Sequence, residues 1–342
     1  MTRIGKGLSA FLLALVLAGT AQAQWHTSPE VKALYEAAKK EGQVVFWGTQ
    51  EREVKWVPQA FAQMFPGIAM KTLGENEIAT KAIAEARAGR HEVDVFWHGY
   101  AGVGALKQRE LLAKVDWSMF GLPPGDIVFD GHAGFTNTIA YAFAYNKDRV
   151  KPADLPKKWT DVLDPKYKGK MAASAFLLPF LVGNLGLAWG EEKAMQFARD
   201  LAGQTDLLLT RAPRESLLQS GERLYATAEV ESQVRLWAAE GNAVDFVILD
   251  PAIVAPFGVA VMAKAPQPSA ARLLAGWIAS REGRLARQKA VFSYDYRPGA
   301  DDPEGRKLHA SGVQVLVFAP EQAERRNELA RKAAAILTQQ AR

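Results

Sequence analysis

The sequence predicts an α/β protein built as two lobes, each with a mostly parallel sheet flanked by helices. Strand-like and helix-like segments alternate in two separate runs, over residues 28–97 and 170–249. Such alternation places helices on both faces of a parallel sheet. Extended apolar stretches follow the two runs, at residues 138–146 and 253–263. The chain is therefore expected to leave the first lobe, build the second and return through two crossover segments.

The N-terminus has the pattern of a secretory signal peptide. Arg3 and Lys6 form a short positive region, residues 8–18 are apolar, and residues 21–23 supply the small-x-small pattern that precedes cleavage. The apolar stretch is short for a bilayer span, and no cysteine is present to carry a lipid. We therefore expect cleavage after Ala23 and a chain free in the periplasm. The alternative is an uncleaved anchor helix.

The elements of the first run carry their own start and stop signals. Ser28 caps a helix that has proline in its first turn, and Gly42 ends that helix. Residues 44–47 are β-branched and aromatic, as in a buried parallel strand. The remaining elements expected in this run are helices at 54–64 and 75–88 and strands at 68–72 and 93–97.

The second run repeats the alternation without repeating the sequence. Met195, Ala198 and Leu201 recur at helical spacing, and Gly221 ends a short helix that begins at Glu215. The other elements expected in this run are strands at 207–209, 224–228 and 244–249 and a helix at 229–239.

The crossovers divide the chain into a discontinuous first lobe and a continuous second lobe. Residues 24–138 and 250–342 are assigned to the first lobe, the latter with the C-terminal helices, and residues 139–249 to the second. Segments near 136–142 and 248–254 then join the lobes. Bending at these two segments would close the lobes on a ligand.

Composition excludes several kinds of chemistry. The 342 residues include no cysteine, which removes thiol nucleophiles, thiolate metal sites and disulfides. The formal charge of +5 falls to about +3 without Arg3 and Lys6, which is too little to indicate nucleic-acid binding. The sequence contains no Gly-x-Ser-x-Gly elbow and no His-Glu-x-x-His motif. We therefore assign no catalytic residue, no metal ligand and no cofactor, and a hydrolase is the weaker alternative.

A ligand of open α/β sheets is expected beyond the carboxyl ends of the strands, where loops meet helix N-termini. The rule selects Thr49, Glu51, His98 and Tyr100 in the first lobe and Ser174, Arg211, Arg214, Glu229 and Glu231 in the second.

The loop at residues 210–214 is the most informative of these segments. It lies between a strand and a helix, so backbone amides and the positive helix end face the ligand. Arg211 and Arg214 add two guanidinium groups, which can grip a carboxylate or phosphonate with paired hydrogen bonds. The alternative is that both arginines are solvated or pair with nearby acids such as Glu215.

The acidic and aromatic candidates each have a structural alternative. Glu229 and Glu231 are expected to begin a helix, where carboxylates are favoured by the helix dipole alone. Trp47 and Trp97 end buried strands, so packing in the core is the favoured interpretation for both.

Tyr100 is a better candidate for the ligand site than the tryptophans. His98 could supply a hydrogen bond there, although it has no spaced partner for metal ligation.

Residues 143–172, FAYNKDRVKPADLPKKWTDVLDPKYKGKMA, resemble the crossover segment of bacterial extracellular solute-binding proteins of the type II periplasmic fold. Further similar stretches lie at 44–49, 65–68, 93–99, 220–227 and 255–278. The ferric-ion, thiamine, polyamine and aminoethylphosphonate binders are the most similar groups. The resemblance implies capture of a solute between the lobes and delivery to an ABC permease and its ATPase in the inner membrane.

The chain departs from the iron-binding branch at the residues that would hold the metal. That branch carries two adjacent tyrosines where residues 228–232 read AEVES, and a histidine where Thr49 and Glu51 flank Gln50. Tyr225 lies nearby but is solitary. A ferric site built on a tyrosine pair is therefore not expected, although the three carboxylates Glu51, Glu229 and Glu231 keep a metal site open as an alternative.

We predict a monomeric periplasmic binding protein that performs no chemistry and has no nucleic-acid partner. The favoured ligand is a small organic anion or a zwitterion, such as an amino-phosphonate or amino-carboxylate. It would be held by residues 210–214, with Glu51, His98 and Tyr100 closing from the first lobe and an acidic side chain receiving an ammonium group. The alternatives are a ferric-ion or other metal-binding protein of the same fold and a ligand-binding partner of a membrane sensor.

Overall fold

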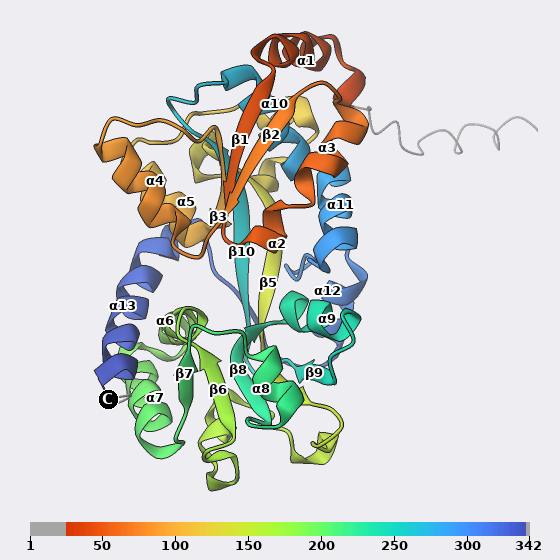
Figure 1. Ribbon diagram of the computed structural model, residues 1–342. Coiled ribbons are helices and arrows are strands. Elements are labelled where there is room, and N and C mark those ends of the chain that lie inside the picture. The colour runs from red at the N-terminus through yellow and green to blue at the C-terminus, as the bar shows by residue number, and fades with distance from the viewer. Residues whose placement is uncertain (1–24, 340–342) are drawn as a thin grey trace, which may run out of the picture.

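The computed structural model describes residues 25–339, so the predicted signal peptide at 1–23 lies outside the described residues. Two lobes lie end to end, and the long strands β5 (Ala133–Asn146) and β10 (Ala252–Val261) run between them (Figure 1). The chain passes from the first lobe to the second along β5 and returns along β10. Strands and helices alternate in both lobes as the two runs predict, with further helices that the sequence did not predict.

A single sheet passes through both lobes, with β2, β1, β3, β10, β5, β8, β6 and β7 as neighbours in that order. In the first lobe β1 pairs in parallel with β2 and β3, and in the second β6 pairs in parallel with β7 and β8. The crossover strands are antiparallel to each other, and in the main sheet β10 is antiparallel to β3 and β5 is antiparallel to β8. The strands of the two parallel sets are β1 (Gln43–Gly48), β2 (Ala69–Gly74), β3 (Val95–Gly99), β6 (Met171–Ser174), β7 (Leu208–Thr210) and β8 (Tyr225–Val230).

The short strands β4 (Ile127–Val128) and β9 (Val244–Val247) pair with β5, and β11 (Val315–Val317) pairs with β10.

The first helix begins and ends where the sequence signals it, whereas the helix predicted at 75–88 spans Ile78–Arg87 and the helix Tyr100–Lys107 was not predicted. Ser28 Oγ accepts a hydrogen bond from the Val31 amide at 3.2 Å, and Gly42 ends the same helix with a φ of 73°. The helix predicted at 54–64 is two helices, because Pro58 fixes a new helix start. The helices are α1 (Pro29–Glu41), α2 (Glu51–Val54), α3 (Val57–Met64), α4 (Ile78–Arg87), α5 (Tyr100–Lys107), α10 (Pro268–Ala279), α11 (Arg281–Val291) and α12 (Pro303–Ala310).

The second lobe contains one helix that the sequence analysis did not predict, α6 (Leu177–Trp189). Its apolar residues surround the helix instead of forming a stripe, which is typical of a fully buried helix and hides the helical period. The helix predicted to begin at residue 229 begins at Glu231, because Glu229 still lies in β8. The other helices are α7 (Glu191–Gln204), α8 (Glu215–Ser220) and α9 (Glu231–Ala239).

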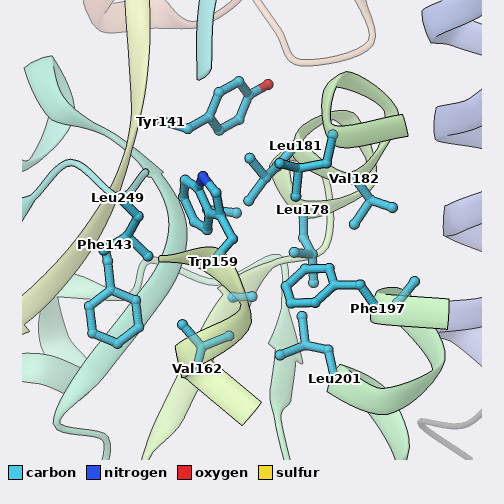
Figure 2. Close-up of a cluster of buried hydrophobic side chains, with 14 of the residues drawn as sticks. Tyr141, Phe143, Trp159, Val162, Leu178, Leu181, Val182, Phe197, Leu201 and Leu249 are labelled. Carbon is cyan, nitrogen blue, oxygen red and sulfur yellow. The ribbon is translucent and has the colours of Figure 1, made fainter. Parts of the chain in front are cut away.

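Each lobe has its own hydrophobic core. In the first lobe the alternating side chains of β3 feed both faces of the sheet, with Trp97 in one cluster and Phe96 in the other. Trp47 and Trp97 are 4% and 2% exposed, so both pack in the core. In the second lobe Phe143 and Trp159 belong to one buried cluster with Leu178, Leu181 and Val182 of α6 (Figure 2). Tyr141 lies at one end of this cluster, with its hydroxyl turned away from the other labelled side chains (Figure 2).

The C-terminal helix α13 (Ala323–Gln339) runs along the side of the molecule past both lobes (Figure 1). It packs against α5 of the first lobe and, over most of its length, against α6 and α7 of the second. The sequence predicts that residues 250–342, which include this helix, belong to the first lobe. Within residues 25–339, no helix combines the length and the apolar character that a membrane span requires.

Candidate functional site

The predicted site residues lie where the two lobes face each other. Helix α2 of the first lobe stands opposite α8, α9 and the end of β8 in the second (Figure 1). Thr49, in the segment between β1 and α2, is half-buried, and Glu51 is exposed at the first position of α2. The carboxyl ends of β1 and β8 are thus on the two sides of the interlobe space, as the sheet rule predicts.

Arg214 and Glu229 form a buried pair on the second lobe. Nε and Nη2 of Arg214 donate to the two carboxylate oxygens of Glu229 at 2.6 and 2.9 Å. The Glu229 side chain is fully buried and that of Arg214 is 13% exposed. A two-point guanidinium–carboxylate bond of this kind is strong and fixes both groups. Arg214 therefore already has a carboxylate partner within its own lobe.

Arg52 was not selected from the sequence, and it is the guanidinium that faces this pair from the first lobe. Its side chain is half-buried on α2, and Nη2 donates to Oε1 of Gln50. Among the described residues, Arg52 has no carboxylate within salt-bridge distance, and its Nε is buried without a hydrogen-bond partner. Burial lowers the pKa of Arg52, and the nearby carboxylates of Glu53 and Glu229 oppose that change. Extending the strand-end rule by one residue beyond Glu51 would have found it.

Arg211 bridges the two lobes at the edge of the same region. Its Nη1 lies 3.4 Å from Oε1 of Glu77, which directly precedes α4 in the first lobe. Both side chains are mostly exposed, at 84% and 63%. A single exposed ion pair of this length contributes little to stability, so the two lobes are only weakly held together at this point.

Ser174 lies at the end of β6, and its hydroxyl is hydrogen-bonded to backbone amides at the start of α6. Its Oγ accepts hydrogen bonds from the amides of Phe176 and Leu177, at 3.3 and 3.1 Å. The hydroxyl therefore satisfies the free amides at that helix end.

Glu231 lies against a crossover strand. Oε2 of its fully buried carboxyl accepts a hydrogen bond from the Ala140 amide of β5 at 2.7 Å. Within the described part of the chain its Oε1 has no partner. Burial raises the pKa of Glu231 to about 8, and the Ala140 hydrogen bond and Arg235 oppose the rise. The side chain is therefore linked to the crossover that joins the lobes and is separate from the Arg214–Glu229 pair.

His98 and Tyr100 lie on the first-lobe side, at the end of β3 and the start of α5. The His98 ring stacks on Phe96 with ring centroids 5.6 Å apart, and burial lowers its pKa to about 4. The ring is thus neutral at physiological pH and is held by packing. Tyr100 is 8% exposed, packs edge-on against Phe129, and has its pKa raised by burial.

The carboxylates that could have held a metal are not brought together. Glu229 is bound to Arg214 and Glu231 to the Ala140 amide, while Glu51 is exposed on α2. Over residues 25–339 there is no group of three or more histidine, aspartate or glutamate side chains arranged to hold a metal ion. The donor set therefore fits a ferric ion poorly, because hard metal ions require several oxygen ligands at once.

The chain belongs to the bacterial extracellular solute-binding proteins, since the model of that family matches residues 126–312, more than half of its length. Members of this family bind solutes and are not enzymes, so this chain is a solute-binding protein. The family resemblance predicted from the sequence is confirmed. No curated protein sequence matches the chain.

Solved structures share the fold at low sequence identity. Iron-bound HitA from Pseudomonas aeruginosa has a TM-score of 0.73 and 17% identity, over 86% of this chain and 99% of that one. AfuA from Actinobacillus pleuropneumoniae, with fructose-6-phosphate bound, has a TM-score of 0.72 and 17% identity, over 87% and 99%. AgtB from A. tumefaciens R10, in complex with agropinic acid, has a TM-score of 0.71 and 14% identity, over 87% and 99%. The predicted two-lobed α/β fold class is therefore confirmed.

Proposed function

We propose that this protein captures a small organic anion, or a zwitterion with an anionic group, between its lobes and delivers it to an ABC importer. In this proposal the mature chain begins after Ala23 and works as a monomer in the periplasm. An inner-membrane permease and its ATPase receive the solute. The chain carries out no reaction on it.

The observation that carries the proposal is that Arg52 is partly buried and, among the described residues, has no carboxylate partner. A partly buried guanidinium without a carboxylate partner is unfavourable, because burial removes water without replacing it by an opposite charge. An anionic group placed between Arg52 and the Arg214–Glu229 pair would supply that charge and accept a hydrogen bond from the buried Nε of Arg52. It would also contact both lobes, which is the condition for stabilising a closed arrangement.

The charged side chains around the interlobe region support a ligand that carries an anionic group. Arg52, Arg211 and Arg214 all lie at the interlobe region, and Arg211 is the most exposed of them. Of the acids chosen to receive an ammonium group, Glu229 and Glu231 are already bound within the protein. Glu51 is exposed on α2 and is the one assigned that role for a zwitterion.

The relatives support the same class of ligand. Fructose-6-phosphate and agropinic acid, the ligands in the AfuA and AgtB structures, both carry an acidic group. HitA binds iron, and the metal alternative remains an outcome of the experiment.

A thermal-shift screen over organic anions, amino acids, polyamines and metal salts tests the proposal, because a ligand that binds only the folded state raises the melting temperature. The best organic anion is then titrated by calorimetry into the wild type, Arg52→Met and Arg90→Met. Arg90 is an exposed arginine at the far end of the first lobe and serves as the matched control.

We expect at least about tenfold weaker binding for Arg52→Met, since it loses a charge-assisted hydrogen bond, and no change for Arg90→Met. Equal affinity in all three proteins would contradict the role of Arg52. A response to ferric salts alone would replace the anion by a metal ion.

A further inference from the structure

A small cavity of ≈ 70 Å³ lies between the lobes, on the side of the crossover strands that α13 covers. Tyr100 of the first lobe, Tyr141 and Phe257 of the crossover strands, and Phe180 of α6 contribute to its walls. The walls are therefore mostly apolar. Three polar side chains also line the cavity, those of Asn184, Gln322 and Arg326, and Oε1 of Gln322 already accepts a hydrogen bond from the Ala319 amide at 2.9 Å.

Asn184 is a buried hydrogen-bond donor with nothing to donate to. Its side chain is 2% exposed on α6, and in residues 25–339 its Nδ2 has no hydrogen-bond partner. Leaving a buried amide unpaired costs about 1–3 kcal/mol. A side chain of this kind at the wall of a cavity indicates that an acceptor belongs there.

Arg326 brings a positive charge to the same cavity. Its guanidinium lies over the ring of Phe180, 4.4 Å from the centroid, and beside the hydroxyl of Tyr141. Burial lowers the pKa of Arg326, and the neighbouring side chain of Tyr141 partly offsets this shift. None of the salt bridges in the described chain involves Arg326. The cation is therefore partly desolvated and has no carboxylate.

The two donors are held in place by close packing of α6 on α13. A Cβ added at Gly183 would lie 2.9 Å from the carbonyl oxygen of Arg326, and one added at Gly186 would lie 3.0 Å from Leu329. At Gly183 the contact is with backbone, so only glycine permits this approach of the two helices. The side chains of Asn184 and Arg326 thus converge from elements whose distance is fixed, which favours binding because little order is lost.

The size of the cavity limits what can fill it. A water molecule has a share of about 30 Å³ in the liquid, and a dry cavity that accepts benzene measures about 150 Å³. A space of ≈ 70 Å³ is therefore large enough for a carboxylate on a short aliphatic stem.

We propose that this cavity is a subsite for a carboxylate group on a short aliphatic stem, bound by Nδ2 of Asn184 and the guanidinium of Arg326. The inference rests on the proposed function, because it adds a second anion-binding point to the interlobe site. It narrows the solute class to acids whose carboxyl group is carried on a short aliphatic stem.

Propionate is the probe, with propionamide as its uncharged analogue of the same size. Calorimetric titration compares the wild type, Asn184→Leu, Arg326→Met, Arg331→Met and Arg52→Met. Arg331→Met is the matched control, because Arg331 is exposed on the same helix as Arg326.

We expect saturable binding of propionate to the wild type, at least about tenfold weaker binding to Asn184→Leu and Arg326→Met, and a similar weakening for propionamide. Arg331→Met should bind propionate within twofold of the wild type. Asn184→Leu should melt no lower than the wild type, because it removes an unpaired buried donor while keeping the shape of the side chain. Lower affinity without loss of stability separates recognition from misfolding.

Absence of propionate binding to the wild type would overturn the inference and leave water as the occupant of the cavity. Equal affinity for propionamide, or an unchanged affinity in Arg326→Met, would overturn it as well. Loss of propionate binding in Arg52→Met alone would place the carboxylate beside Arg52 and the Arg214–Glu229 pair. That result would overturn this inference and support the proposed function.

Discussion

Replacement of Glu231 by glutamine should remove a pH-dependent contribution to stability. The carboxyl is 0% exposed, accepts one hydrogen bond from the Ala140 amide, and has its pKa raised from 4.5 to about 8. The charged and titratable groups nearby are Arg235 on the same helix and Tyr294, Tyr296 and Glu304 from the segment packed beside it. Glutamine keeps the acceptor for Ala140 but cannot ionise.

The size and sign of the effect follow from the two pKa values. Between pH 4.5 and about 8 the unfolded chain releases this proton while the folded chain keeps it, so the free energy of unfolding falls as the pH rises. Each pH unit within that window corresponds to about 1.4 kcal/mol. From pH 5 to pH 7 the wild type should therefore lose about 2–3 kcal/mol relative to Glu231→Gln.

Urea unfolding at pH 5, 6 and 7 measures this difference. Glu240→Gln, at the exposed end of the same helix, is the control and should follow the wild type at every pH. Parallel pH profiles for the wild type and Glu231→Gln would refute the reasoning, because the buried carboxyl would then not be protonated in the folded protein at neutral pH.

Three further results are expected. Glu229→Gln should lower the free energy of unfolding by about 3 kcal/mol, because it leaves the mostly buried Arg214 without its carboxylate. The control Glu222→Gln, at an exposed position, should change the free energy of unfolding by less than about 0.5 kcal/mol. Equal effects of the two substitutions would contradict a buried Arg214–Glu229 pair. Gly102→Ala should lower the free energy of unfolding by about 1–3 kcal/mol, because the new Cβ would lie 2.4 Å from the His98 ring. A melting temperature equal to that of the wild type would show that the His98 ring can move aside without cost. The radius of gyration in small-angle scattering should fall when the best solute saturates the protein, because the lobes close by bending at the crossovers, and no change would count against closure.

The architecture could be predicted from the sequence because its signals are local. The cap at Ser28, the stop at Gly42 and the alternation of strands and helices depend on residues close together in the chain. Helix α6 could not be found in this way, because its apolar residues lie all around the helix and leave no polar face to reveal its period.

The candidate site was predictable only as a region. The strand-end rule chose Arg214 and Glu229, but their pairing joins residues on different elements, and the sequence does not show which acid a given arginine will reach. For the same reason the rule did not distinguish Glu231, which binds a crossover strand, from Glu229. Arg52 and Arg326 gain their importance from the partners they lack, which only the folded structure reveals.

A crystal structure of the mature protein with its tightest-binding solute tests the central claim most directly. The account predicts the solute between the lobes, with its acidic group within hydrogen-bond distance of the Arg52 guanidinium and facing the Arg214–Glu229 pair. A solute bound outside the interlobe region, or a metal ion held by Glu229 and Glu231 with Arg214 displaced, would contradict it.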